Sequence, residues 1–145
     1  MKNITKVRKQ VATIANRINR KIKDLSAAFK RAWQIVKGRV LVSKVSGVTF
    51  GNRQAALRKL DRLDTSSVNV SLEREQGNPH DTDAVKVNVS VGNGKGYHLG
   101  YVPRELASLI APLLDKGIGL IARFKGVTGG YYEDMHHGAL ITVEM

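Results

Sequence analysis

The chain has 145 residues, the size of one domain or of a small domain with an appendage. Apolar residues make up 42% of it, enough for a hydrophobic core, which excludes a disordered chain. There is no cysteine, which excludes disulfides and thiolate metal sites, and no stretch approaches the ~20 apolar residues of a membrane span. We therefore expect a soluble, cytoplasmic protein.

The positive charge is concentrated in the first quarter of the chain. The formal net charge is +12, and residues 1–40 contain 12 Lys or Arg against a single acidic residue, Asp24. Residues 41–145 contain 12 basic and 11 acidic residues. This asymmetry predicts a basic arm, 1–40, joined to a near-neutral domain, 41–145. Such an arm indicates a polyanionic partner, most often nucleic acid.

The arm has the pattern of an amphipathic helix. Its larger apolar residues, from Ile4 to Val36, follow one another at spacings of three or four. Gly38 is suited to end the helix, and either Asp24 or Ser26 is suited to begin a second one, so one long helix and a helical pair are both open. The basic residues expected to contact phosphates are Arg17, Arg20, Lys23, Lys30 and Arg31. Packing on the domain, a membrane surface, a partner's groove and a coiled coil between protomers are the alternatives.

The body reads as short strands with two helices. Strands are expected at 40–42, 45–50, 68–73, 84–91, 97–102, 118–127 and 139–143, and helices at 52–63 and 103–114, with Pro103 at the first helical position. Residues 92–96, GNGKG, are expected to form a hairpin turn between two of the strands. Many short strands with turn signals predict an α+β fold built on a small, partly open barrel.

No pattern in the chain indicates catalysis. The adjacent His136 and His137 lack a spaced metal-binding partner, and a turn that holds Asp81 and Asp83 is common without a metal. There is no nucleophile elbow and no HExxH motif. We expect no enzyme, no cofactor and no metal.

The stretch 76–87, QGNPHDTDAVKV, predicts a tight polar loop that leads into a half-buried strand. With GVTF at 47–50 and LGYVPRELASLIAPLL at 99–114, it resembles the HIRAN domain family over about 44–145, in three co-linear blocks. Members of this family occur fused to fork-remodelling helicases and nucleases, and as stand-alone bacterial and phage proteins. The resemblance implies an OB-like barrel with two helices that captures single-stranded DNA, in the helicase-linked members by the 3′-hydroxyl end.

The resemblance also implies roles for individual residues. Asp81 accepts the 3′-hydroxyl, and Asn78 and Pro79 fix its loop. Phe50 stacks on the terminal base, and His80 falls on a second stacking position, where the family has Tyr or Phe. Arg104 binds backbone phosphate. Lys86, Arg74, Tyr131 and Tyr132 are further candidates, with ordinary solvated side chains as the alternative. A turn in which Asp81 caps its own backbone is the structural alternative for the whole loop.

We therefore expect a non-enzymatic DNA-binding module with no membrane partner. The alternative is a phage-type inhibitor or adaptor that binds a nucleic-acid-processing complex, such as a CRISPR effector nuclease. In that case the basic arm is the contact surface and the pocket is secondary.

Overall fold

The computed structural model describes residues 9, 11–13, 16, 40–132 and 135–144. Residues 9 and 11–13 are helical, as is residue 16, and Val11 is fully buried in the same hydrophobic cluster as the core of the domain. The candidate phosphate contacts of the arm, Arg17, Arg20, Lys23, Lys30 and Arg31, lie outside the described residues. The choice between one helix and two lies there as well.

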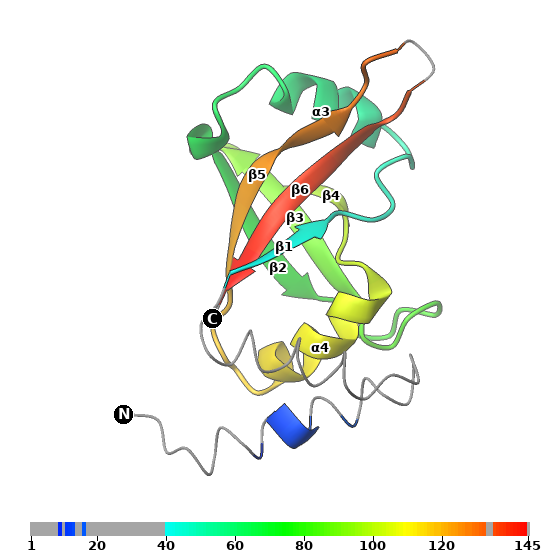
Figure 1. The fold of residues 1–145 in the computed structure, drawn as a ribbon, viewed down its shortest axis with the longest axis vertical. Coiled ribbons are helices and arrows are strands. Elements are labelled where there is room, and N and C mark those ends of the chain that lie inside the picture. The colour runs from blue at the N-terminus through cyan, green and yellow to red at the C-terminus, as the bar shows by residue number, and fades with distance from the viewer. Residues whose placement is uncertain (1–8, 10, 14–15, 17–39, 133–134, 145) are drawn as a thin grey trace.

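The domain is an α+β barrel of the OB-like kind, as expected. Its antiparallel sheet has the strand order β1-β6-β5-β2-β3-β4. The strands are β1 (Leu41–Lys44), β2 (Val68–Arg74), β3 (Val85–Val91), β4 (Tyr97–Tyr101), β5 (Ile121–Gly129) and β6 (His137–Glu144). Helix α3 (Arg53–Leu60), the short 3-10 helix η1 (Thr65–Ser67) and helix α4 (Arg104–Asp115) complete the described elements (Figure 1).

The sheet curls until its two edges meet. β1 and β4 lie at opposite ends of the strand order, yet Ser46, just after β1, pairs with Tyr101 at the end of β4. The Ser46 amide donates to the Tyr101 carbonyl at 2.7 Å, and the Tyr101 amide donates to the Ser46 carbonyl at 2.9 Å. At the β2–β5 junction only Asn69 and Arg123 are paired. The pair Ser46–Tyr101 therefore closes the barrel between the edges of β1 and β4, and we call this junction the seam.

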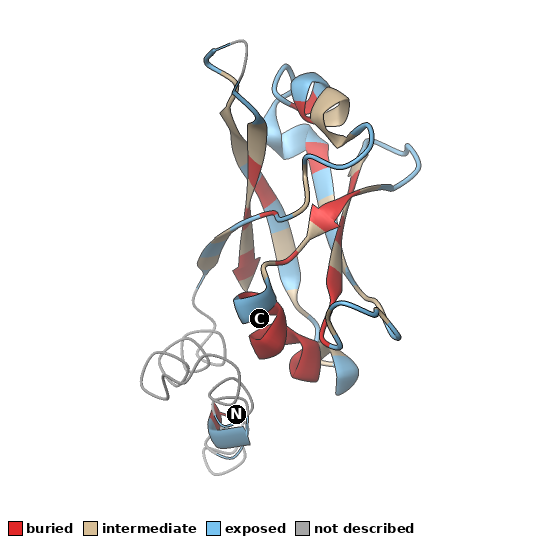
Figure 2. Cartoon of the chain, turned by 90° about the vertical axis from the view of Figure 1, so that its right-hand side faces the viewer, coloured by how far each residue is buried: buried red, intermediate tan, exposed pale blue. Residues whose placement is uncertain are grey.

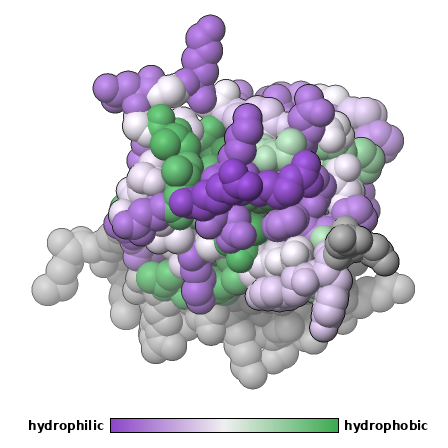
Figure 3. Space-filling model, turned by 90° about the horizontal axis from the view of Figure 1, so that it is seen from above, coloured by the Kyte–Doolittle hydropathy of each residue, from purple (hydrophilic) through white to green (hydrophobic). Residues whose placement is uncertain are grey.

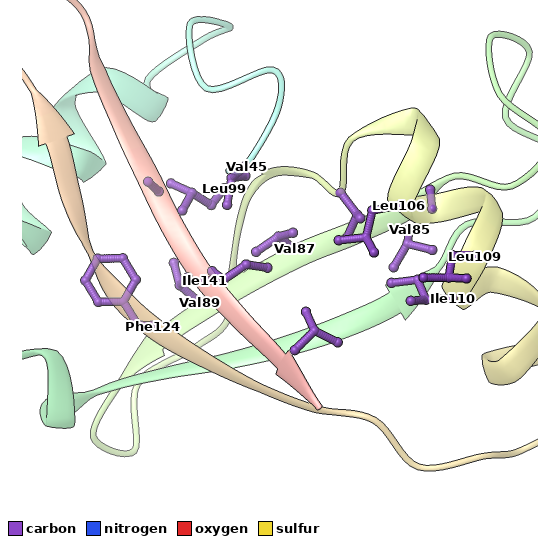
Figure 4. Packing of buried hydrophobic residues seen from close by; sticks show 14 of the residues in the cluster. Val45, Val85, Val87, Val89, Leu99, Leu106, Leu109, Ile110, Phe124 and Ile141 are labelled. Carbon is purple, nitrogen blue, oxygen red and sulfur yellow. The ribbon is translucent and has the colours of Figure 1, made fainter. Parts of the chain in front are cut away.

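The core fills the barrel and the space beneath it. In β3 the residues Val85, Val87 and Val89 are buried and alternate with half-buried polar ones, which is the period of a strand with one apolar face. Figure 4 shows Val85 facing Leu106 and Ile110 of α4, and Val45 beside Leu99 near the seam. Burial of these side chains stabilises the barrel by removing apolar surface from water.

The two helices lie at opposite ends of the barrel (Figure 1). α4 covers the lower end, and its residues from Leu106 to Leu113 are all buried (Figure 2). Pro103 was expected at the first helical position, but with an extended ψ of 143° it stands one residue before it, and α4 begins at Arg104. α3 covers the other end through Leu57 and Leu60, and seen from that end the surface is crossed by hydrophilic side chains (Figure 3).

One expected strand is wrong. Residues 45–50 contribute the Ser46 bridge and one hydrogen bond from the Val45 amide to the Ala139 carbonyl, and then turn back toward α3. Gly47 and Gly51 adopt φ values of +75° and +58°, which reverse the chain and which an apolar alternation does not reveal. The other strands and helices expected in the body of the chain are present within a few residues of the expected bounds.

Candidate nucleic-acid interface

The loop between β2 and β3 is organised by the side chain of Asn78. Its Oδ1 accepts the backbone amides of His80 at 2.8 Å and of Asp81 at 3.0 Å, which forms an Asx turn. Oδ1 of Asp81 in turn accepts the amide of Asp83 at 2.9 Å. Each carboxamide or carboxylate oxygen thus takes the place of a backbone carbonyl as the acceptor for these amides. These contacts fix the direction in which the Asp81 carboxylate points.

Arg74 holds the same loop from behind. Its guanidinium donates to the carbonyls of Glu75 and Ala84, at 3.0 and 3.1 Å, and to that of Thr82 at 2.6 Å. It also lies 3.9 Å from the buried Asp83 carboxylate, and only 13% of the side chain is exposed. Arg74 therefore supports the loop, and its contact with phosphate stays a prediction.

A pocket of about 240 Å³ lies where this loop meets the seam and the start of α4. Four of the sequence-predicted site residues line it: Asn78, His80, Asp81 and Arg104. Ser46, Ala84, Tyr101 and Val102 complete its lining. The Arg104 guanidinium also donates to the His80 carbonyl, which ties the first turn of α4 to the loop. A carboxylate, an arginine and an imidazole therefore converge on one small opening.

A charged network contacts the pocket residues Asn78 and Tyr101. Glu75 accepts a hydrogen bond from Nδ2 of Asn78 at 2.7 Å and lies 3.6 Å from Nζ of Lys86. The Asn78 bond lowers the pKa of Glu75 against the opposing effect of burial, with smaller contributions from Tyr101 and Lys86. Burial, followed by the hydrogen bond to Glu75, raises the pKa of Tyr101. At neutral pH the carboxylate is therefore ionised and the phenol protonated, so Tyr101 is the donor to Glu75.

Phe50 lies at the rim and does not line the pocket. The residue is 68% exposed. A Cβ placed on Gly47 would lie 3.7 Å from the Phe50 ring and 3.9 Å from the Tyr101 ring, so the two aromatic side chains flank this glycine. Arg53 donates to the Gly47 carbonyl at 2.6 Å and anchors the loop that presents Phe50. The ring is thus held beside the pocket with its surface open to solvent.

His98, a residue of β4, contacts the Arg53 side chain that anchors the Phe50 loop. Its Nε2 lies 2.8 Å from the Gly100 carbonyl and its Nδ1 lies 3.3 Å from the Arg53 guanidinium. Because a carbonyl only accepts and a guanidinium only donates, the neutral ring with hydrogen on Nε2 satisfies both. Burial, followed by the positive charge of Arg53, lowers the pKa of His98. Its ring also meets that of Tyr101 edge to face, with centroids 4.8 Å apart.

Tyr131 and Tyr132 lie at the tip of the β5–β6 hairpin, 79% and 78% exposed, and neither lines the pocket. The hairpin rises beside α3, whereas the β2–β3 loop lies toward the α4 end (Figure 1). Gln54 connects the hairpin to the Phe50 loop, because its Nε2 donates to the carbonyls of Val48 and His137 at 3.0 and 2.9 Å.

Sequence reasoning missed Ser46, Tyr101 and Glu75. The β3–β4 register shifts between Val87 and Asn88, and this interrupts the alternation of β4, so periodicity does not place Tyr101 at the pocket. Ser46 reaches the pocket only because the barrel closes there. The one available signal was for Glu75, which stands three residues before Asn78, within reach of a turn.

A second, larger groove of about 540 Å³ runs between β2 and β5. Its cation is Arg123, which is already paired with Glu144. Across the described ranges, no cluster of three or more His, Asp or Glu side chains is placed to hold a metal ion. The small pocket therefore has the more convergent chemistry.

Comparison with known proteins agrees with this geometry. The family model described as HIRAN domain matches residues 44–134, well over half of the chain. The chain belongs to the HIRAN domain family. Helicase-like transcription factor from Oryctolagus cuniculus is 35% identical over 82 residues, 54% of this HIRAN chain and 8% of that protein. The protein of the same name from Mus musculus is 35% identical over 78 residues, 51% of this chain and 7% of that protein.

The chain thus spans less than a tenth of the length of these curated relatives. A solved structure of a protein from Lactobacillus plantarum is also similar to this HIRAN chain, with a TM-score of 0.49 and 24% sequence identity. That similarity covers 73% of this chain and 95% of the other.

Proposed function

We propose that the chain binds single-stranded DNA and holds its 3′ end in the pocket at the barrel seam. Membership of the HIRAN domain family supports a DNA-binding module. The observation that carries the finer proposal is the convergence of Asn78, His80, Asp81 and Arg104 on one pocket of about 240 Å³. These residues come from two separate segments of the chain, which a simple turn does not require.

The chemistry of the pocket suits a strand end. A free 3′-hydroxyl is a hydrogen-bond donor, whereas an internal nucleotide carries an anionic phosphate at that atom. The Asp81 carboxylate accepts the hydroxyl and repels the phosphate. Arg104, exposed at the opening, contacts the phosphate that precedes the terminal sugar. The pocket is smaller than the ~300 Å³ of typical small-molecule sites, so it takes the sugar end and leaves the base outside.

The base then stacks on the rim. Phe50 presents an exposed ring beside the pocket, and His80 presents an exposed imidazole from the loop. Stacking on aromatic side chains is worth ~1–3 kcal/mol per base and tolerates any sequence. Tyr131 and Tyr132 are candidates for nucleotides further along the strand, since Gln54 holds their hairpin against the Phe50 loop. The arm adds sequence-independent phosphate contacts through Arg17, Arg20, Lys23, Lys30 and Arg31.

The alternative of an inhibitor or adaptor depends on the basic arm, nearly all of which lies outside the described residues. No helix among the described residues is long and apolar enough to cross a membrane.

Paired variants test the pocket. Asp81→Asn keeps an oxygen that accepts the Asp83 amide, so the loop is retained while the negative charge is lost. We expect this variant to lose its preference for a free 3′-hydroxyl, by roughly tenfold, as for a hydrogen bond to a charged group. Asp61→Asn, an exposed carboxylate next to α3, is the matched control. If fluorescence anisotropy shows the same preference for a free 3′-hydroxyl in both variants, the pocket is refuted as the site.

A further inference from the structure

The side chain of Glu75 bonds to the pocket residue Asn78 and does not line the pocket itself. Its Oε2 accepts the hydrogen bond from Nδ2 of Asn78 at 2.7 Å, and its Oε1 lies 3.6 Å from the ammonium of Lys86. About a quarter of each charged side chain of this pair is exposed. Glu75 is fixed through its backbone as well, because its amide donates to the Ala84 carbonyl at 3.0 Å across the base of the loop.

This contact decides which way the Asn78 carboxamide faces. A carboxylate only accepts hydrogen bonds, so it holds the NH₂ group of Asn78 toward itself and turns Oδ1 the other way. Oδ1 then meets the amides of His80 and Asp81. In the opposite orientation the NH₂ group would face those two N–H donors, and an amide oxygen would face the carboxylate. The turn that directs Asp81 would lose its acceptor.

We propose that Glu75 is the positioning residue of the pocket. It orients the Asn78 carboxamide and, through that carboxamide, the loop residues His80 and Asp81. The inference rests on the proposed function, because it states how the receptor for the strand end is kept in shape. Glu75 touches no nucleotide in this arrangement. Its contribution to binding passes through the loop, while Tyr101 and Lys86 also hold the carboxylate.

A reciprocal exchange separates positioning from a general structural role. In Glu75→Gln the amide facing Asn78 no longer selects one orientation. In Asn78→Asp two carboxylates face each other. In the double variant the amide introduced at position 75 again donates to one oxygen of the carboxylate introduced at position 78, and the second oxygen of that carboxylate again accepts the loop amides. The double variant therefore restores the hydrogen-bond pattern with the same total charge, and rescue is expected only if orientation is the role.

Glu73→Gln is the matched control. Glu73 is an exposed glutamate in β2, two positions before Glu75, whose Oε2 likewise accepts from an asparagine, Asn88, at 2.9 Å. It differs from Glu75 in lying outside the hydrogen bonds of the β2–β3 loop. Any effect of removing a glutamate charge or a Glu–Asn bond in general therefore appears in both variants.

Two readouts are needed, and the first uses no DNA. Amide hydrogen exchange of His80 and Asp81, measured by NMR, is expected to quicken by roughly tenfold in Glu75→Gln and in Asn78→Asp, and to return toward the wild-type rate in the double variant. The second readout is the ratio of affinities for single strands with a 3′-hydroxyl and a 3′-phosphate, which is expected to fall and recover in parallel. The melting temperature is expected to change little in Glu75→Gln and not to follow the ratio.

Unchanged exchange in Glu75→Gln, or a double variant no better than the worse single one, overturns the inference. A fall in melting temperature that accounts for the faster exchange also overturns it, since that is a structural role. If the wild-type protein shows no preference between the two strand ends, the proposed function fails instead. The exchange rates still decide the role of Glu75 in that case.

Discussion

The substitution Gly100→Ala tests whether the seam closes the barrel. Gly100 lies in β4, opposite the segment that follows β1, and no side chain fits between the two backbones there. A Cβ at this position would overlap the carbonyl oxygen of Ser46 and lie 2.8 Å from Cγ1 of Val45. Both atoms belong to buried or hydrogen-bonded groups with no room to withdraw, so the edge of the sheet must open.

The cost follows from what the opening breaks. The bridge between Ser46 and Tyr101 contains two backbone hydrogen bonds, each worth about 1 kcal/mol net. Displacing Val45, which is 5% exposed, adds the ~1–3 kcal/mol of an overpacked core. Together these lower the free energy of unfolding by about 3–5 kcal/mol. At roughly 5 °C per kcal/mol for a domain of this size, the melting temperature falls by about 15 °C or more.

Urea unfolding and thermal melts followed by circular dichroism measure this difference. Gly96→Ala is the control, because it precedes the same strand, has no neighbour within 4 Å of an added Cβ and has no positive φ. If the Gly100→Ala variant melts at the same temperature as the Gly96→Ala control, the two edges of the sheet are free to part. The single pair would then not be what closes the barrel.

Two further substitutions address the support of the site. Arg74→Met removes the guanidinium beside the buried Asp83 carboxylate and one donor from each of three loop carbonyls, so we expect a loss of roughly 3 kcal/mol in urea unfolding. Arg58→Met, on the exposed face of α3, should stay within about 0.5 kcal/mol of wild type, and an equal loss in both would refute this role. His98→Gln should flatten the dependence of stability on pH. The folded pKa of His98 lies below its usual 6.5, so the unfolded chain binds the proton first and wild-type stability falls as pH drops from about 7 to 5. The lowered pKa of Glu75 acts only below that window, and a wild-type melting temperature that is constant across it would contradict the assignment.

Local periodicity predicted most of the fold. The alternation of Val85, Val87 and Val89 and the helical spacing from Leu106 to Leu113 both match the observed burial. The strand expected at 45–50 failed because two glycines with positive φ turn the chain there, and apolar alternation does not register backbone handedness. The closure of the barrel was not predictable at all, since it depends on which strand edges meet in space.

For the site as well, the sequence predicted the local features, and the tertiary contacts were not predictable. Asn78, His80 and Asp81 are close in the sequence, and the family resemblance added Arg104, which the structure brings to the same pocket. Phe50 was expected to stack on the terminal base, and it is exposed beside the pocket without lining it. Tyr101 and Ser46 reach the pocket through the seam. The structure shows that Arg74, a candidate phosphate contact, is largely buried and supports the loop. Residue type predicted the chemistry, and only the tertiary structure separated side chains that line the pocket from side chains that hold the loop.

The central claim is that the pocket receives a free strand end, and one comparison tests it most directly. Fluorescence anisotropy at about 0.15 M salt, where surface charges are largely screened, would compare a short single strand bearing a 3′-hydroxyl with the same strand blocked by a 3′-phosphate and with a blunt duplex. The account predicts clearly tighter binding of the free hydroxyl, roughly tenfold over the blocked strand. Equal affinity for all three would contradict it, and would identify the loop around Asp81 as a turn without a ligand.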